Sequence, residues 1–78
     1  MATTFKTIHA QIARRIDRLA KQAWDAAPAD TILSDALAAR PALLESYRTA
    51  VRRRGEIETD AIMCGRAWRD STGAFRWR

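Results

Sequence analysis

The segment PALLESYRTAVRRRGEIETDAIMCGRAWRD, residues 41–70, decides how many helices the chain forms. Its apolar residues recur every three to four positions, so they fall on one side of a single helix. These residues are Leu43, Tyr47, Ala50, Ile57, Ala61, Cys64 and Trp68. Pro41 suits the first helical position, where its missing N–H leaves no hydrogen bond unmade. The segment therefore predicts one long helix over residues 41–70, with Cys64 as a small apolar residue on its inner side.

Gly55 offers the alternative of two shorter helices. The run Arg52-Arg53-Arg54 before it is typical of a helix C-terminus, and Glu56 and Glu58 after it suit a new start. In a continuous helix, Arg52 and Arg54 instead precede Glu56 and Glu58 by four residues and form ion pairs on the surface. We favour the continuous helix and keep the interrupted one, which makes a four-helix bundle, as the alternative.

Outward from this segment, residues 4–26 predict a first helix that Thr3 or Thr4 caps. Its apolar stripe consists of Phe5, Ile8, Ile12, Ile16, Leu19, Ala23 and Ala27. His9 lies at the edge of this stripe, where we expect a partly packed ring.

A break at Ala27-Pro28-Ala29-Asp30 separates this helix from a short second one over residues 31–39. Pro28 disfavours helical backbone at Ala27, and Asp30 is a good N-cap for the second helix. The expected fold class is all-α: a small three-helix bundle with a long C-terminal helix and a short extended tail.

That tail is aromatic and basic. After the turn-like Ser71-Thr72-Gly73, aromatic and basic side chains alternate over residues 74–78. We expect a helical bundle domain over residues 1–70 and a C-terminal docking tail over residues 71–78. Its candidate partner-binding residues are Phe75, Arg76, Trp77 and Arg78, since aromatic side chains fill pockets of a partner or stack on unpaired bases. The alternative is that the tail folds back and covers the end of the bundle.

The positive charge lies mainly in the second part of the chain. Residues 1–47 carry six basic and five acidic side chains, and residues 48–78 carry eight and four, which is +4 of the net +5. Such an excess attracts anionic partners. The candidate contacts to an anionic partner or nucleic acid are Arg48, Arg52, Arg53, Arg54, Arg66 and Arg69. Alternatively, these side chains only meet solvent.

Catalysis is not expected. The chain has one cysteine, one histidine and three isolated glycines, which give no catalytic constellation, no metal site and no phosphate-binding loop. We expect no cofactor and no small-molecule substrate. No stretch of about 18 apolar residues or signal segment points to a membrane, so a soluble cytoplasmic protein, or one built into a virion, is expected.

The function that fits these features is a non-enzymatic adaptor or accessory protein that docks on a larger protein assembly. Small basic helical proteins of this length are common among bacteriophage structural and host-interaction proteins. One alternative is a small basic nucleic-acid-binding module, and another is a small protein inhibitor of an enzyme complex.

Overall fold

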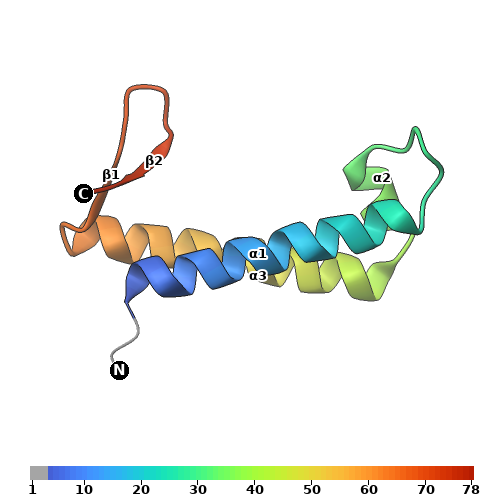
Figure 1. The fold of residues 1–78 in the computed structure, drawn as a ribbon, viewed down its shortest axis with the longest axis horizontal. Coiled ribbons are helices and arrows are strands. Elements are labelled where there is room, and N and C mark those ends of the chain that lie inside the picture. The colour runs from blue at the N-terminus through green and yellow to red at the C-terminus, as the bar shows by residue number, and fades with distance from the viewer. Residues whose placement is uncertain (1–3) are drawn as a thin grey trace.

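A computed structural model of the chain describes residues 4–78. These residues form three helices and two short strands in the order α1 (Phe5–Asp25), α2 (Leu33–Ala38), α3 (Pro41–Met63), β1 (Ala67–Arg69) and β2 (Phe75–Trp77). The predicted mostly helical fold with three helices is confirmed (Figure 1).

Helix α1 begins and ends within one residue of its prediction. Thr4 caps it, and the Thr4 side-chain oxygen accepts a hydrogen bond from the Thr7 N–H at 3.2 Å. Thr3, the other predicted cap, lies outside the described residues. The buried residues Ile16, Leu19 and Ala23 belong to the predicted stripe.

Helix α2 is shorter than predicted, and Asp30 does not cap it. The N-cap is Ile32, which makes no side-chain hydrogen bond to the helix. Asp30 lies instead in a turn that the Thr31 N–H closes on the Pro28 carbonyl oxygen at 3.0 Å. The predicted helix began at residue 31, and α2 begins only at Leu33 because this turn precedes it.

Helix α3 runs unbroken through Gly55, as the apolar spacing predicted, but the prediction that it reaches residue 70 is wrong. It ends at Met63 in a Schellman motif, in which Arg66 N–H bonds to Ala61 C=O at 2.8 Å and Gly65 N–H to Ile62 C=O at 3.0 Å. Gly65 takes a left-handed φ of +74°, which a residue with a Cβ adopts only at a cost. The glycine that ends the helix is therefore Gly65.

This early end corrects the expectations for Cys64 and Trp68. Beyond Gly65 the chain is extended, so side chains alternate between two faces and no longer follow the helical stripe. Cys64 and Trp68 are exposed, whereas Ala67, which directly precedes Trp68, is buried.

Strands β1 and β2 pair as an antiparallel hairpin in the register Ala67↔Trp77, Trp68↔Arg76 and Arg69↔Phe75. The extended segment predicted at the C-terminal end is thus strand β2. The boundary proposed between residues 70 and 71 falls in the turn of this hairpin, which joins the predicted bundle and the predicted tail.

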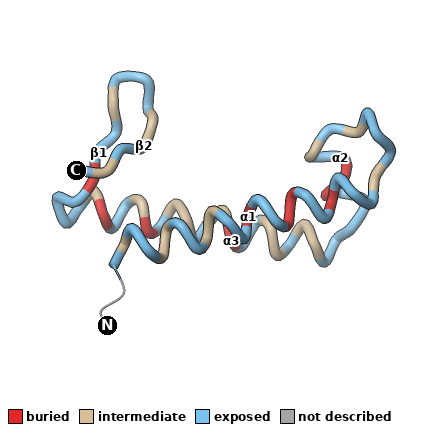
Figure 2. The backbone as a smooth tube through the Cα atoms, viewed as in Figure 1, coloured by how far each residue is buried: buried red, intermediate tan, exposed pale blue. Residues whose placement is uncertain are grey.

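Helices α1 and α3 pack side by side in opposite directions and form the body of the molecule (Figure 1). Helix α2 rises at one end of the pair and the hairpin at the other, on the same side in this view. Buried residues follow the seam of the pair and reach Ala67 at the base of the hairpin (Figure 2). None of the helices among residues 4–78 is long and apolar enough to cross a membrane.

Candidate docking surface at the hairpin end

Three aromatic rings attach the hairpin to the start of α1. The His9 ring stacks on Phe75 with ring centroids 5.2 Å apart, and it meets Trp77 edge-on at 5.4 Å. Phe75 and Trp77 also pack edge-to-face at 4.8 Å. Such pairs contribute about 0.5–1.5 kcal/mol each beyond the area they bury. The half-buried ring predicted for His9 is confirmed, and its partners are the aromatic residues of β2.

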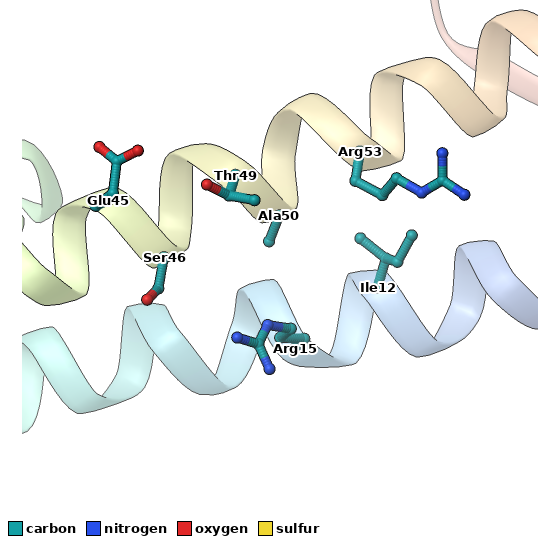
Figure 3. A pocket seen from close by; sticks show the side chains of 7 residues that line it. All are labelled: Ile12, Arg15, Glu45, Ser46, Thr49, Ala50 and Arg53. Carbon is teal, nitrogen blue, oxygen red and sulfur yellow. The ribbon is translucent and has the colours of Figure 1, made fainter.

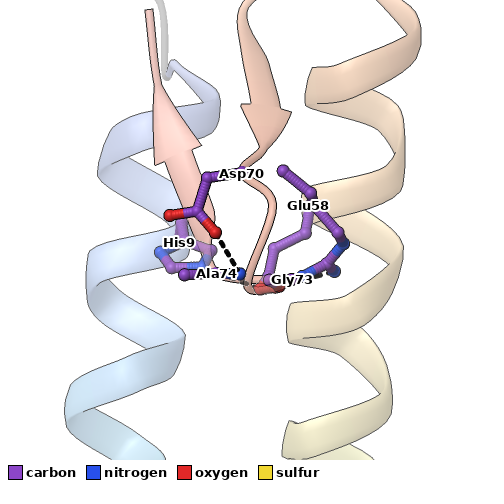
Figure 4. Close-up of polar contacts among 6 residues, drawn as sticks. His9, Glu58, Asp70, Gly73 and Ala74 are labelled. Atoms are coloured by element: carbon purple, nitrogen blue, oxygen red, sulfur yellow. Dashed lines mark hydrogen bonds and ion pairs between the residues drawn. The ribbon is translucent and has the colours of Figure 1, made fainter.

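Glu58 on α3 joins the same cluster from the other helix. Its carboxylate lies 3.3 Å from Nε2 of His9 and accepts a hydrogen bond from the Arg69 guanidinium at 3.4 Å. Figure 4 shows His9 on α1, Glu58 on α3 and, between the two helices, the bond of the hairpin turn from Ala74 to Asp70. The Glu58 side chain is only 12% exposed, and it pairs with His9 and Arg69 instead of forming the surface ion pair predicted with Arg54. Glu58 therefore ties α1, α3 and β1 together.

The hairpin turn is organised by Asp70. Its carboxylate accepts hydrogen bonds from the backbone N–H groups of Thr72 and Ala74 at 2.9 and 3.1 Å, and from Nε of Arg76 at 3.1 Å. The Thr72 hydroxyl donates to it as well. The hydroxyl of Thr72, followed by Arg76, lowers the pKa of the Asp70 carboxyl from 3.8 to about 2. The turn predicted at residues 71–73 is confirmed, with Gly73 at a φ of +84°.

The outer face of the hairpin, defined here as Trp68 and Arg76, points away from the His9 cluster. These two residues are directly opposite each other in the register, whereas Phe75 and Trp77 occupy the inner face. Trp68 is 43% exposed and takes part in none of the aromatic pairs found among residues 4–78. Met63, the last residue of α3, is 81% exposed at the same end of the molecule.

The structure divides the predicted arginine set among several surroundings. Arg48 and Arg52 are exposed on α3, where Arg53 pairs with Glu56 at 3.2 Å and Arg54 is half-buried. Arg69 is engaged differently, because it bonds to Glu58 and to the Gly73 carbonyl oxygen at 3.1 Å and lies 5.9 Å from the centre of the Phe75 ring. Arg66 and Arg78 are exposed and stand side by side at the open end of the hairpin, joined by a backbone hydrogen bond.

Two grooves accompany these residues. The first has a volume of about 290 Å³ and lies between α1 and α3, where Glu45, Thr49 and Arg53 follow one another along α3 and Arg15 lies opposite on α1 (Figure 3). The second has a volume of about 480 Å³ and lies between the start of α1 and the open end of the hairpin. We call it the basic groove, and its lining residues are Thr4, Phe5, Lys6, Ile8, Arg66, Trp77 and Arg78.

The exposed position of Trp68 and the place of Lys6 in the basic groove could not be predicted from the periodicity of the sequence. Trp68 was placed on a helical stripe because its spacing from Ala61 and Cys64 fits one, and only the Gly65 cap breaks that phase. Lys6 lies far from Arg66 and Arg78 in the sequence, and only folding places the three residues along one groove. The glycine that ends the helix is visible in the sequence, whereas the place of Lys6 in the basic groove depends on tertiary structure.

No cluster of three or more His, Cys, Asp or Glu side chains suited to hold a metal ion occurs in the described part of the chain. Comparisons with protein-family models, with curated proteins and with solved structures found no match to this chain. The chemistry of the surface therefore carries the functional argument.

Proposed function

We propose that this protein is a non-enzymatic adaptor that docks on a larger protein assembly through the outer face of its hairpin, Trp68 and Arg76, at the end of the molecule where Met63 is also exposed. The observation that supports this most is the exposed indole of Trp68 in a rigid hairpin. Tryptophan, arginine and methionine are enriched in protein interfaces, and the first two dominate binding hot spots.

The hairpin's attachment to the helices favours this use. The Asp70 turn and the His9 cluster hold the two strands before any partner arrives, so little conformational entropy is lost on binding. Phe75 and Trp77, the aromatic residues first expected to meet the partner, are half-buried against His9. We assign them to holding the hairpin and assign the contact to Trp68.

The expected partner surface has an apolar pocket for an indole and acidic groups around it. The side chain of Arg76 is 60% exposed although its Nε bonds to Asp70, and its guanidinium suits the acidic groups of such a rim. A phage structural protein and an inhibited enzyme are two kinds of assembly that would fit this description.

The test is an affinity capture from the native host with three baits: the natural protein, Trp68→Ala and Trp24→Ala. Trp24 is a matched control, since it is 49% exposed at the opposite end of α1. We expect one assembly to be enriched by the natural protein and by Trp24→Ala, and lost with Trp68→Ala. Equal capture by all three baits, or no enriched protein, would contradict the proposal.

The point variants leave both strands in place, whereas a deletion of the tail removes residues 75–77, which form half of the hairpin. Circular dichroism of each bait should show unchanged helix content. A purified candidate partner should then bind Trp68→Ala at least about tenfold more weakly than Trp24→Ala, as expected for a hot-spot tryptophan.

A further inference from the structure

The basic groove concentrates positive charge from three separate elements. Lys6 comes from the first turn of α1, Arg66 follows the end of α3, and Arg78 follows β2. The Arg78 N–H donates to the Arg66 carbonyl oxygen at 3.0 Å, which fixes the two arginine positions next to each other. All three side chains belong to exposed residues.

This charge is not neutralised within the described residues. None of the residues that line the groove is acidic, and none of the ion pairs found among residues 4–78 involves Lys6, Arg66 or Arg78. The groove between α1 and α3 differs, since Glu45 lines it together with its two arginines. An anionic ligand therefore fits the basic groove.

The same groove has an apolar part. Phe5, Ile8 and Trp77 line it, and the Trp77 ring is held edge-on by Phe75 and His9, so its position is fixed before a ligand binds. Cations beside a fixed aromatic ring match a ligand that carries both phosphates and flat, unsaturated rings.

We propose that the basic groove binds single-stranded nucleic acid, with phosphates on Lys6, Arg66 and Arg78 and an unpaired base against Trp77. A duplex keeps its bases stacked inside, so it can use the three cations but not the apolar part of the groove. This site goes beyond the proposed docking function and does not depend on it, because Trp68 and Arg76 do not line the groove.

The first test measures fluorescence anisotropy of labelled single strands of about 12 nucleotides, DNA and RNA, and of a duplex of equal length. The protein variants are the groove triple, Lys6→Gln/Arg66→Gln/Arg78→Gln, and a control triple, Arg14→Gln/Arg15→Gln/Arg18→Gln. The control changes exposed residues of α1 and lowers the net charge by the same three units.

At about 50 mM salt we expect the groove triple to bind single strands at least tenfold more weakly than the natural protein, and the control triple less than about threefold more weakly. Each lost phosphate contact lowers the slope of log affinity against log salt by about 0.7, so the groove triple should lose about 2 from this slope. Equal losses in the two triples would overturn the proposal, because net charge alone would then explain the binding.

The second test follows the Trp77 fluorescence in a Trp24→Phe/Trp68→Phe background, where Trp77 is the remaining indole. Single strands should quench this fluorescence with the same midpoint as the anisotropy change, and duplex should not. Tighter binding of duplex than of single strands, or unchanged Trp77 fluorescence at saturation, would overturn the assignment of the base to this groove. So would displacement of the single strand by an acidic, Phe-containing peptide that binds the groove more tightly.

Discussion

Gly55 and Gly65 lie ten positions apart and have opposite effects on α3. Gly55 is inside the helix, and a Cβ built there meets nothing within 4 Å. Gly65 holds the left-handed position that closes the Schellman motif, where a side chain is strained even though the space around it is open.

We predict that Gly55→Ala raises the free energy of unfolding by up to about 1 kcal/mol, because glycine costs roughly that much in a helix interior. Gly65→Ala should lower it by about 1 kcal/mol, since the left-handed conformation is unfavourable for alanine. Urea denaturation followed by circular dichroism measures both. Destabilisation by Gly55→Ala would contradict a continuous α3.

The Asp70 carboxylate should make the hairpin sensitive to acid. Its pKa is lowered to about 2 in the folded protein, so its ionised form stabilises the turn at any pH above its ordinary value of 3.8. This contribution is lost as the pH falls from about 4 towards 2, when the carboxylate takes up a proton. The N–H signals of Thr72 and Ala74, which donate to this carboxylate, should shift over this range.

Thr72→Val tests the cause of the lowered pKa. Valine keeps the branched shape but removes the hydroxyl, which has the largest effect on Asp70, so the pKa of Asp70 should rise towards 3.8. An NMR titration of the Asp70 carboxyl carbon measures it. Thr59→Val, at an exposed position of α3, is the control and should leave this pKa at about 2. An unchanged pKa in Thr72→Val would assign the effect to Arg76 and the backbone.

Among the elements, the hairpin depends most on contacts outside itself. Two three-residue strands do not form a stable unit in water alone. The contacts that hold them come from His9 on α1, Glu58 on α3 and the burial of Ala67. We therefore attribute the order of the hairpin to the helix pair beneath it.

His9→Ala should loosen the hairpin without unfolding the helices. It removes two aromatic pairs worth about 0.5–1.5 kcal/mol each, so amide exchange at Asp70 and Arg78 should become roughly tenfold faster or more. His9→Phe keeps the ring, loses only the contact to Glu58, and should have a smaller effect. Gln11→Ala, exposed on α1, is the control. Equal exchange rates in His9→Ala and the control would show that the rings do not hold the hairpin.

The periodicity of the sequence sufficed for the elements whose contacts are local. It located α1 and the continuity of α3 through Gly55, and the turn-like residues Ser71-Thr72-Gly73 located the hairpin turn. It missed β1, because three residues are too few to show a period of two and the helical spacing continued through Cys64 and Trp68. It also missed the partners of Glu58, since His9 precedes Glu58 by 49 residues and only folding brings them together. The outer face of the hairpin was missed because β1 is too short to show a strand pattern. The basic groove was missed because its residues are far apart in the sequence.

The molecule as a whole is thin and open. Its radius of gyration is 14.7 Å, whereas a compact domain of this length has about 11.5 Å, and its shortest dimension is 16 Å. It exposes 5773 Å² of surface, against about 4,800 Å² for a typical monomer of 8.8 kDa.

The shape leads to a prediction for solution scattering. At low protein concentration, small-angle X-ray scattering should give a radius of gyration close to 14.7 Å, because the hairpin and α2 stand out from the ends of the helix pair. A value near 11.5 Å would mean that the hairpin and α2 fold onto helices α1 and α3. Light scattering on the same samples gives the molecular mass and separates the monomer from self-association.

The His9 cluster also orders events in time. Its aromatic residues come from the first and last elements of the described chain, and contacts between such distant residues close a large loop and therefore form slowly. During synthesis the ribosome releases α1 long before Phe75 and Trp77, so Trp68 is presented on a fixed hairpin only after the helices have paired.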